Sequence, residues 1–337
     1  MNLHVLKPGL QTTVQDGGRR GHAALGVGAS GAMDDIALRL ANALVGNPPG
    51  AAALEMTLIG PELRLDRDAV IALTGAELDA HAAGPRREPM ALPMWRPLHL
   101  AAGSVLVCGR LHAGARSYLA VAGGFAVDPV LGSESTDINA GLGPFDGRAL
   151  AAGDVVAIDG AGRPRGPGKP TGSAAAEAPS QAWSLDPRPW SYPDTARPVR
   201  LIRGSHFDAL DEASRQRLFG AGFRIAAESN RVGLRLEGPP LALSAPLELV
   251  SEPVAAGTVQ LPPGGQPIVL MAEHPTTGGY PRIGQVAAID LPRLGQRRPG
   301  DPLRFVPIGI DEAQTRYLAR ERELARLVEI VRERLAQ

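Results

Sequence analysis

Apolar residues along this chain occur in short runs that glycine or proline interrupts. Runs of this kind cover residues 69–73, 104–108, 117–122, 154–158, 199–202, 258–261, 268–272 and 286–289. Short apolar runs bounded by turn-forming residues are typical of strands. The 41 glycines and 31 prolines fit the many turns that such strands need. The pattern therefore predicts a mainly β protein with a few helices (β-rich α+β), of the barrel or sandwich type.

Three segments follow a helical period instead, namely residues 34–45, 207–219 and 311–336. In the last of them an apolar face lies amid alternating arginines and glutamates, which predicts a C-terminal amphipathic helix. Asp311 and Gln314 resemble a capping pair at its start. We expect this helix to pack against the barrel; a helix that binds a partner is the alternative.

The composition changes between residues 160 and 198, where prolines, glycines and alanines interrupt any period. Such composition is typical of a linker, and a length of 337 residues fits two domains. Trp183 and Trp190 lie in its later part, where we expect their rings to dock onto a domain. We therefore expect an N-terminal β-rich lobe, a linker, a C-terminal β-barrel lobe and a final helix, over residues 1–160, 161–197, 198–310 and 311–337.

Charge and composition argue against several classes of function. The chain carries 35 basic and 35 acidic side chains, so no net field favours nucleic acid or an anionic membrane as a partner. The N-terminus lacks the pattern of a secretion signal, and no run reaches the ~18 apolar residues of a membrane span. The single cysteine, Cys108, lies in an apolar run and is expected in the core. We expect a cytoplasmic protein.

Two glycine-rich polar segments near opposite ends of the chain are the best candidates for chemistry. Residues 9–34 contain Gln15, Asp16 and Arg19, whose acceptors and forked donor could point into one cavity. An Asp–Arg pair that only braces a turn is the alternative. Residues 273–284 combine an imidazole, hydroxyls, a phenol and flexible backbone in His274, Thr276, Thr277, Gly278, Gly279 and Tyr280. We expect both segments to line one cleft; ordinary glycine turns are the alternative.

Further polar residues stand beside expected helices and strands. Ser30 and Asp34 precede the first expected helix, where either can cap it or contact a ligand. Glu55 alternates with apolar neighbours, as a buried paired carboxylate or a base beside a cleft would. The remaining candidates for ligand contact are Thr74, Gly75 and Ala76, where a strand is expected to open into a loop, and Asn230, Arg231, Glu252 and Gln260. Plain turns are the alternative for these.

Together with residues 37–63, 71–80, 117–125, 130–137, 229–238 and 251–262, these segments resemble the allophanate hydrolase subunit 2 family. The likeness runs in order from about Leu3 to Phe305. The family includes the C subunit of bacterial 5-oxoprolinase, an antagonist of a sporulation kinase inhibitor, and the carboxyltransferase domain of urea carboxylase. The resemblance implies two related cyclophilin-like β-barrel lobes with a cleft between them.

The resemblance implies the C subunit of a 5-oxoprolinase-like complex, which hydrolyses the lactam of 5-oxoproline to glutamate with ATP. The catalytic candidates are then Asp16, Glu55, His274 and Tyr280. Subunit-B-like and subunit-A-like chains would be the partners, and ATP would act through the complex because this chain has no P-loop motif. The spacing of its histidines supports no metal site.

Two alternatives stay open under the same resemblance. One is a carboxyltransferase that moves a carboxyl group from carboxybiotin, carried by a separate chain, to urea or another small amide. The other is a regulatory protein that binds a subunit-B-like kinase inhibitor without catalysis.

The sequence departs from the family pattern at five positions. Asn230 and Val232 stand where Asp and Met are expected, and Glu134 where a basic or small residue is common. Pro144 replaces a usual glycine, and Pro275 replaces the glutamine of many relatives. These departures bear most on the identity of the substrate.

Overall fold

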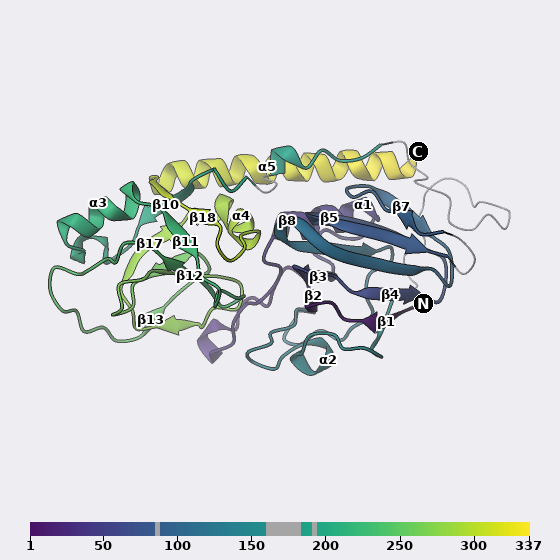
Figure 1. The fold of residues 1–337 in the computed structure, drawn as a ribbon, viewed down its shortest axis with the longest axis horizontal. Helices are drawn as coiled ribbons and strands as arrows, with labels where there is room; N and C mark the ends of the chain where they lie inside the picture. Colours follow the sequence, from purple (N-terminus) through teal and green to yellow (C-terminus); the bar gives the residue numbers. More distant parts are fainter. Residues whose placement is uncertain (85–87, 160–182, 191–193) are drawn as a thin grey trace. The chain divides into compact units, whose positions relative to one another are not determined.

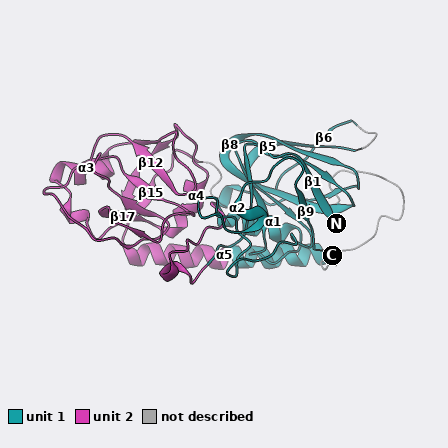
Figure 2. Ribbon diagram, turned by 90° about the horizontal axis from the view of Figure 1, so that it is seen from below, with its two compact units in different colours: residues 1–19, 34–192, 324–337 teal, residues 20–33, 193–323 magenta. Residues whose placement is uncertain are grey.

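The computed structural model describes residues 1–84, 88–159, 183–190 and 194–337 (Figure 1). Strands dominate and helices are few, which confirms the expected mainly β fold. The chain divides into two compact units, coloured separately in Figure 2. Unit 1 contains residues 1–19, 34–192 and 324–337, and unit 2 contains residues 20–33 and 193–323. Most of the linker expected over residues 161–197 lies outside the described residues, and the expected domain limits and cleft stay predictions.

Unit 1 is built on a curled sheet of nine strands. Its strands are β1 (Asn2–Lys7), β2 (Gln11–Gln15), β3 (Ala53–Thr57), β4 (Glu62–Leu65), β5 (Ala69–Ala83), β6 (Met90–Ala91), β7 (Pro97–Leu100), β8 (Val105–Val121) and β9 (Val155–Ala157). Neighbours follow the order β2-β3-β8-β4-β1-β9, and β5 pairs with β6, β7 and β8. The expected runs 104–108 and 117–122 thus belong to one long strand.

The strand β5 corrects one expectation of the sequence. It does not open into a loop at Thr74, Gly75 and Ala76 but continues to Ala83 beside β8, with register shifts after Gly75. Gly75 has a φ of +96°, and a Cβ there would lie 2.6 Å from the carbonyl oxygen of Arg116. Glycine therefore permits an irregular pairing at which the strand bends and goes on.

Alternating residues of the unit 1 strands fill its core, and the opposite face of the sheet carries the helix α1 (Asp35–Leu44). The expected helix over residues 34–45 is confirmed, with Asp34 as its N-cap: the carboxylate accepts from Ala37 N at 3.0 Å. A second apolar cluster joins Ile36, Leu40, Trp95, Trp190 and Leu324. Trp190 is thus docked, as expected. Burial raises the pKa of the Cys108 thiol to about 12, in keeping with a core residue.

Unit 2 has its own curled sheet of eight strands. The strands are β10 (Val199–Arg203), β11 (Phe223–Ile225), β12 (Gly233–Glu237), β14 (Thr258–Gln260), β15 (Ile268–Leu270), β17 (Arg282–Val286), β18 (Pro302–Leu303) and β19 (Phe305–Pro307), in the order β18-β11-β12-β15-β14-β17-β10-β19. A separate two-stranded ribbon, here called the β13–β16 ribbon, joins β13 (Glu252–Pro253) to β16 (Thr277–Gly278). The core includes Met33, from the segment at residues 20–33 that crosses into this unit.

Two further expectations about elements of unit 2 are wrong in detail. Of the strand expected over residues 286–289, only Val286 lies in a strand, as the last residue of β17, and the chain then turns into the 3-10 helix η4 (Ala288–Asp290). The single helix expected over residues 207–219 is broken at Leu210, whose backbone is extended. A 3-10 turn, η3 (Phe207–Ala209), precedes the break, and Asp211 then caps α3 (Glu212–Gly220) by accepting from Ser214 N at 2.6 Å.

The C-terminal helix is present as α5 (Ile310–Ala336). It begins one residue before the expected cap at Asp311. Its residues up to Glu323 belong to unit 2, where Ala313 packs with Ala287 and Ile308, and the rest belong to unit 1. The remaining helical turns are η1 (Ala23–Leu25), α2 (Pro144–Gly147), η2 (Arg188–Trp190) and α4 (Leu291–Gly295).

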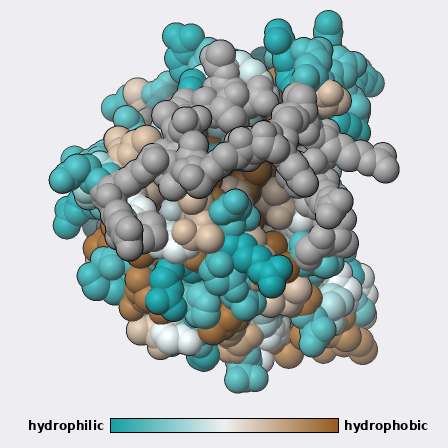
Figure 3. Space-filling model, turned by 90° about the vertical axis from the view of Figure 1, so that its right-hand side faces the viewer, coloured by the Kyte–Doolittle hydropathy of each residue, from teal (hydrophilic) through white to brown (hydrophobic). Residues whose placement is uncertain are grey.

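Side chains of both kinds reach the molecular surface. Hydrophilic and hydrophobic residues lie interspersed on the face drawn in Figure 3, as is usual for globular domains. No helix in the described ranges combines the length and the apolar content that a membrane crossing needs.

Candidate functional site

A row of buried polar side chains crosses the unit 1 sheet on the face opposite its core. Thr13 pairs with Glu55 across β2 and β3, Glu55 with Tyr118 across β3 and β8, and Tyr118 with Thr74 across β8 and β5. We call these four residues the polar row. Each is at most 2% exposed, while the residues that alternate with them point into the apolar core. Such a line of buried polar groups is stable only when its members are hydrogen-bonded.

Tyr118 and Arg116 hold the carboxylate of Glu55 in place. The Tyr118 hydroxyl donates to Glu55 Oε2 at 2.7 Å and accepts from Asp34 N at 2.8 Å. The guanidinium Nε of Arg116 lies 3.7 Å from Glu55 Oε1. Burial, and then the charge of Glu55, raises the pKa of Tyr118 well above 10, which keeps the hydroxyl neutral. Glu55 is therefore a buried, paired carboxylate, as one of the two interpretations of the sequence had it.

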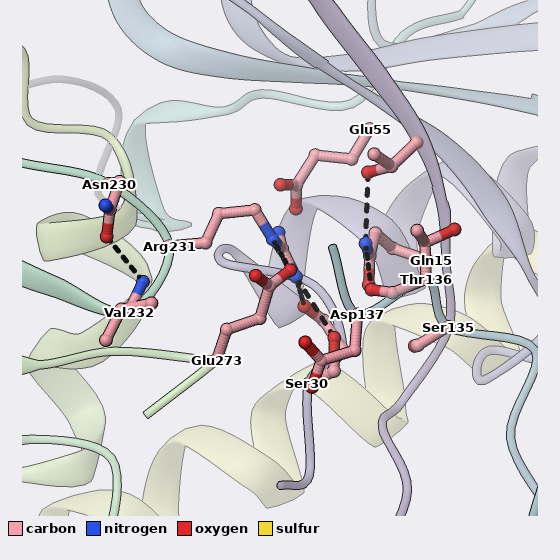
Figure 4. Close-up of polar contacts among 12 residues, drawn as sticks. Gln15, Ser30, Glu55, Ser135, Thr136, Asp137, Asn230, Arg231, Val232 and Glu273 are labelled. Atoms are coloured by element: carbon pink, nitrogen blue, oxygen red, sulfur yellow. Dashed lines mark hydrogen bonds and ion pairs between the residues drawn. The ribbon is translucent and has the colours of Figure 1, made fainter. Parts of the chain in front are cut away.

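Gln15 carries an acceptor that no described residue satisfies. Its Nε2 donates to Thr13 Oγ1 at 3.0 Å and to Thr136 O at 2.9 Å (Figure 4). Its Oε1 is buried and has no hydrogen-bond partner in the described part of the chain. The side chain is fully buried, whereas the oxygen of a surface glutamine accepts hydrogen bonds from water.

Asp16 is engaged by four donors, which favours a structural role over the catalytic one expected. Its Oδ1 accepts from the hydroxyls of Ser133 and Ser135, at 2.7 and 2.5 Å. The backbone N–H groups of Gly18 and Glu134 donate to Oδ1 and Oδ2 respectively, each at 2.8 Å. Burial and the nearby carboxylate of Asp16 raise the pKa of the Glu134 side chain. The carboxylate of Asp16 thus fixes the loop that carries both serines.

Arg19 supports the same loop from a different side. Its Nε donates to Val130 O and its Nη2 to Ser135 O, both at 2.8 Å. The structure therefore favours the alternative in which Asp16 and Arg19 only stabilise the backbone. The sequence suggested that they stabilise a local turn, but their hydrogen bonds to this loop connect residues more than a hundred positions apart.

The Thr74–Ala76 corner also has a structural explanation. The Thr74 hydroxyl donates to Ala37 O of α1 at 2.7 Å, and the Ser117 hydroxyl donates to Ala76 O at 2.5 Å. These bonds attach α1 and β8 to β5. They do not support an oxyanion-binding role for this corner.

In unit 2, a buried ion pair connects parts of the two polar segments. Arg231 Nε lies 2.6 Å from Glu273 Oε1, and Arg231 Nη2 donates to Gly31 O at 2.6 Å (Figure 4). The two charged side chains are 3% and 1% exposed. Ser30 has a φ of +52°, a left-handed conformation that costs energy in a residue other than glycine. Arg231 thus holds a strained turn at Ser30 and Gly31 against the residue that begins the 273–284 segment.

The rest of the 273–284 segment is more exposed and includes one strand of the β13–β16 ribbon. Glu252 of β13 pairs with Gly278 of β16, and the Glu252 carboxylate forms an ion pair with Arg282. The Tyr280 ring is 45% exposed, and Thr277 is exposed. His274 hydrogen-bonds through Nδ1 with Pro275 O at 2.7 Å. Whether these side chains meet a ligand stays a prediction.

Gln260 presents a buried donor under the ribbon. It is 5% exposed, and its Nε2 has no hydrogen-bond partner among the described residues. A Cβ at Gly278 would lie 2.4 Å from this nitrogen, so only glycine lets the ribbon approach it as observed. This contact brings two of the sequence candidates together at one place.

Asn230 is explained by a local turn. The side chain is exposed, and its Oδ1 accepts from Val232 N at 2.8 Å. This is the bond of an Asx turn, which favours the turn interpretation. Among the described residues, no three His, Cys, Asp or Glu side chains gather as metal ligands.

The sequence reasoning missed Arg116 and Tyr118. They are two positions apart on β8, and the same period-two argument that placed Glu55 on one face of β3 would have placed them on one face of their strand. The pairing of β8 with β3 brings Arg116 and Tyr118 to Glu55, and no local pattern in the sequence indicates that pairing.

Comparison with known proteins adds to this geometry. The family model of the carboxyltransferase domain, subdomain A and B, matches residues 25–307. The C subunit of 5-oxoprolinase from Escherichia coli (strain K12) is 38% identical over 312 residues, which cover 92% of this chain and 93% of that protein. The C subunit of 5-oxoprolinase from Haemophilus influenzae is 32% identical over 311 residues, with the same coverage of 92% and 93%.

Among solved structures, the K. lactis urea amidolyase matches with a TM-score of 0.82 at 28% identity. The match covers 96% of this chain but 20% of that one, so this chain spans about a fifth of the length of the amidolyase. The likeness therefore concerns one part of a much longer protein.

Proposed function

Because this chain belongs to the family of carboxyltransferase domains, subdomain A and B, we propose that it is the C subunit of a 5-oxoprolinase-like complex. One observation carries the choice within the family. The C subunit of E. coli 5-oxoprolinase aligns over 92% of this chain and 93% of its own length, at 38% identity. The urea amidolyase match is less similar and covers 20% of that chain.

The reaction proposed for the complex is hydrolysis of a lactam. Water adds to the lactam carbonyl carbon, the ring C–N bond breaks, and the nitrogen takes a proton to give the open amino acid. A lactam is a poor electrophile, so donors that stabilise the developing oxyanion in a dry site lower the barrier. We place the carbonyl oxygen at Gln260 Nε2, the buried donor that has no acceptor among the described residues. The β13–β16 ribbon, with Thr276, Thr277 and Tyr280 on its loop, would cover the substrate.

We propose no ATP site in this part of the chain. Two of its basic side chains, Arg231 and Arg282, already pair with carboxylates, those of Glu273 and Glu252 respectively. A triphosphate would have to displace a carboxylate from one of these pairs. We therefore place ATP on the partner chains, the subunit-A-like or subunit-B-like proteins, and assign this chain the binding of the substrate or its intermediate.

The carboxyltransferase alternative is favoured by the family model and by the urea amidolyase structure. Biotin presents a ureido carbonyl, which fits the buried Gln260 Nε2 donor and the close approach that Gly278 permits. Carboxybiotin, attached to a separate chain, would supply the carboxyl group for a small amide such as urea. In this case Gln260 would hold and orient the ureido carbonyl.

The deciding experiment is reconstitution of the chain with its subunit-A-like and subunit-B-like partners. We expect ATP hydrolysis that depends on 5-oxoproline in the complex and none from the isolated chain, since no nucleotide site is assigned to it. Urea-dependent decarboxylation of carboxybiotin should be measured in parallel. That activity without 5-oxoproline turnover would replace the proposal by the carboxyltransferase alternative. Robust ATP-dependent turnover by the chain alone would contradict the partner requirement.

Within the reconstituted complex, Gly278→Ala is expected to lower kcat/KM at least tenfold, about 1.4 kcal/mol in the transition state. The new methyl group would displace Gln260 Nε2, which lies 2.4 Å from its position. Because that atom is the end of a flexible side chain, the unfolding midpoint should change little. Gly264→Ala is the matched control, since a Cβ there meets nothing within 4 Å. Equal kcat/KM for the two variants would show that Gln260 takes no part in the active site.

A further inference from the structure

His206 is a partly buried histidine of unit 2 to which the proposed function gives no role. It lies beyond the end of β10, at the start of η3. Two hydrogen bonds join it to Arg282, the first residue of β17: His206 N donates to Arg282 O at 3.0 Å, and Arg282 N donates to His206 Nδ1 at 3.1 Å. The approach requires Gly204, because a Cβ there would clash with Arg282 O. His206 thus holds the backbone of Arg282 where the pairing of β10 with β17 has ended.

The bond from Arg282 N determines how the imidazole acts. A backbone N–H only donates, so His206 Nδ1 is the acceptor and carries no proton in this arrangement. The Ser205 hydroxyl lies 3.2 Å from the same nitrogen and can donate to it as well. A side chain of similar size without an acceptor at this position cannot make the bond to Arg282.

Arg282 links the β13–β16 ribbon to the strand that carries Gln260. Its guanidinium donates to Pro253 O at 3.2 Å and pairs with the Glu252 carboxylate, so it contacts both residues of β13. Its backbone is the register partner of Gln260 in the pairing of β17 with β14. A two-stranded ribbon is marginally stable alone, so attachments of this kind fix where it lies. A shift of Arg282 would therefore move the ribbon relative to Gln260.

We propose that His206 is a positioning residue for the reaction assigned to the complex: through Arg282 it holds the ribbon, and with it Gly278, against Gln260. This role rests on the proposed function, in which Gln260 Nε2 donates to the carbonyl oxygen of the lactam. That donor acts on the oxyanion that develops in the transition state. A loosened ribbon therefore lowers kcat more than it changes KM.

Two substitutions separate the acceptor of His206 from the size of its side chain. His206→Phe keeps a ring and loses Nδ1, whereas His206→Asn is smaller and places an acceptor oxygen at the same distance along the side chain. In the reconstituted complex we expect His206→Phe to lower kcat about tenfold and to change KM less than about twofold. His206→Asn should stay within about twofold of the wild type in both. Ser205→Ala removes the other contact of Nδ1 and is the matched control, expected to behave like the wild type.

Hydrogen exchange of the full chain, followed by NMR, reports on the ribbon without any turnover. Val254 N donates to Thr276 O at 3.1 Å next to the ribbon pairs, and its exchange should be about tenfold faster in His206→Phe and unchanged in His206→Asn. A wild-type complex without 5-oxoproline turnover would contradict the proposed function, and the exchange rates would still decide whether His206 holds the ribbon. Wild-type exchange in His206→Phe, equal losses in the Phe and Asn variants, or faster exchange with an unchanged kcat would overturn the role of His206.

Discussion

Replacing Arg231 with methionine is expected to lower the free energy of unfolding by about 3 to 5 kcal/mol. The Glu273 side chain is 1% exposed and would lose a charged partner 2.6 Å away. Gly31 O would lose a donor as well, at the turn where Ser30 is held in a left-handed conformation. Burying a carboxylate without its partner is the dominant cost, since methionine matches much of the arginine stem. Guanidinium denaturation followed by circular dichroism measures the change.

The exposed ion pair of Arg282 and Glu252 offers the matched comparison. Its side chains are 26% and 46% exposed, so solvent screens the charges and Arg282→Met should cost no more than about 1 kcal/mol. The double variant Arg231→Met/Glu273→Leu removes both charges of the buried pair and should recover much of the loss. If Arg231→Met were as mild as Arg282→Met, the buried pair would not stabilise the strained turn as argued.

The local sequence pattern was sufficient to predict those helices that their own apolar period and capping residues determine. The helix α1 has both an apolar face and a cap at Asp34, and α5 has a long amphipathic period, so both were found within one residue of their ends. The segment at residues 207–219 kept a helical period but broke at Leu210, because Asp211 caps a new helix there. At Gly75 the sequence pointed to the end of a strand. The glycine instead permits a bend inside a long one.

The candidate site depended on contacts that no local pattern contains. Asp16 and Arg19 were rightly recognised as polar groups in a special loop, but their partners lie at residues 130–135. Tyr118 reaches Glu55 only because β8 pairs with β3. The Gln15 oxygen without a hydrogen-bond partner is likewise a property of three-dimensional packing. In the sequence, Gln15 looks like any other polar residue of its segment.

The same network gives an expected result for Tyr118→Phe, a loss of about 1.5 to 3 kcal/mol in the free energy of unfolding at neutral pH. The variant removes the hydrogen bond to the buried Glu55 carboxylate and leaves Asp34 N, at the start of α1, without its acceptor. The ring itself stays packed, so no cavity contributes. Urea denaturation at pH 7 gives the difference between wild type and variant.

The pH dependence separates this role from packing alone. The pKa of Tyr118 is raised in the folded state, so between its ordinary value of about 10 and the folded value the unfolded chain gives up the proton while the folded chain keeps it. The stability contributed by this proton is complete below about pH 10 and declines above it in the wild type. Phenylalanine has no such proton, so the stability difference should shrink as the pH rises above 10. Tyr317→Phe, at a 37% exposed ring of α5, should change stability by less than about 0.5 kcal/mol. A Tyr118→Phe variant as stable as the wild type would show that the hydroxyl does not hold Glu55 and α1 together.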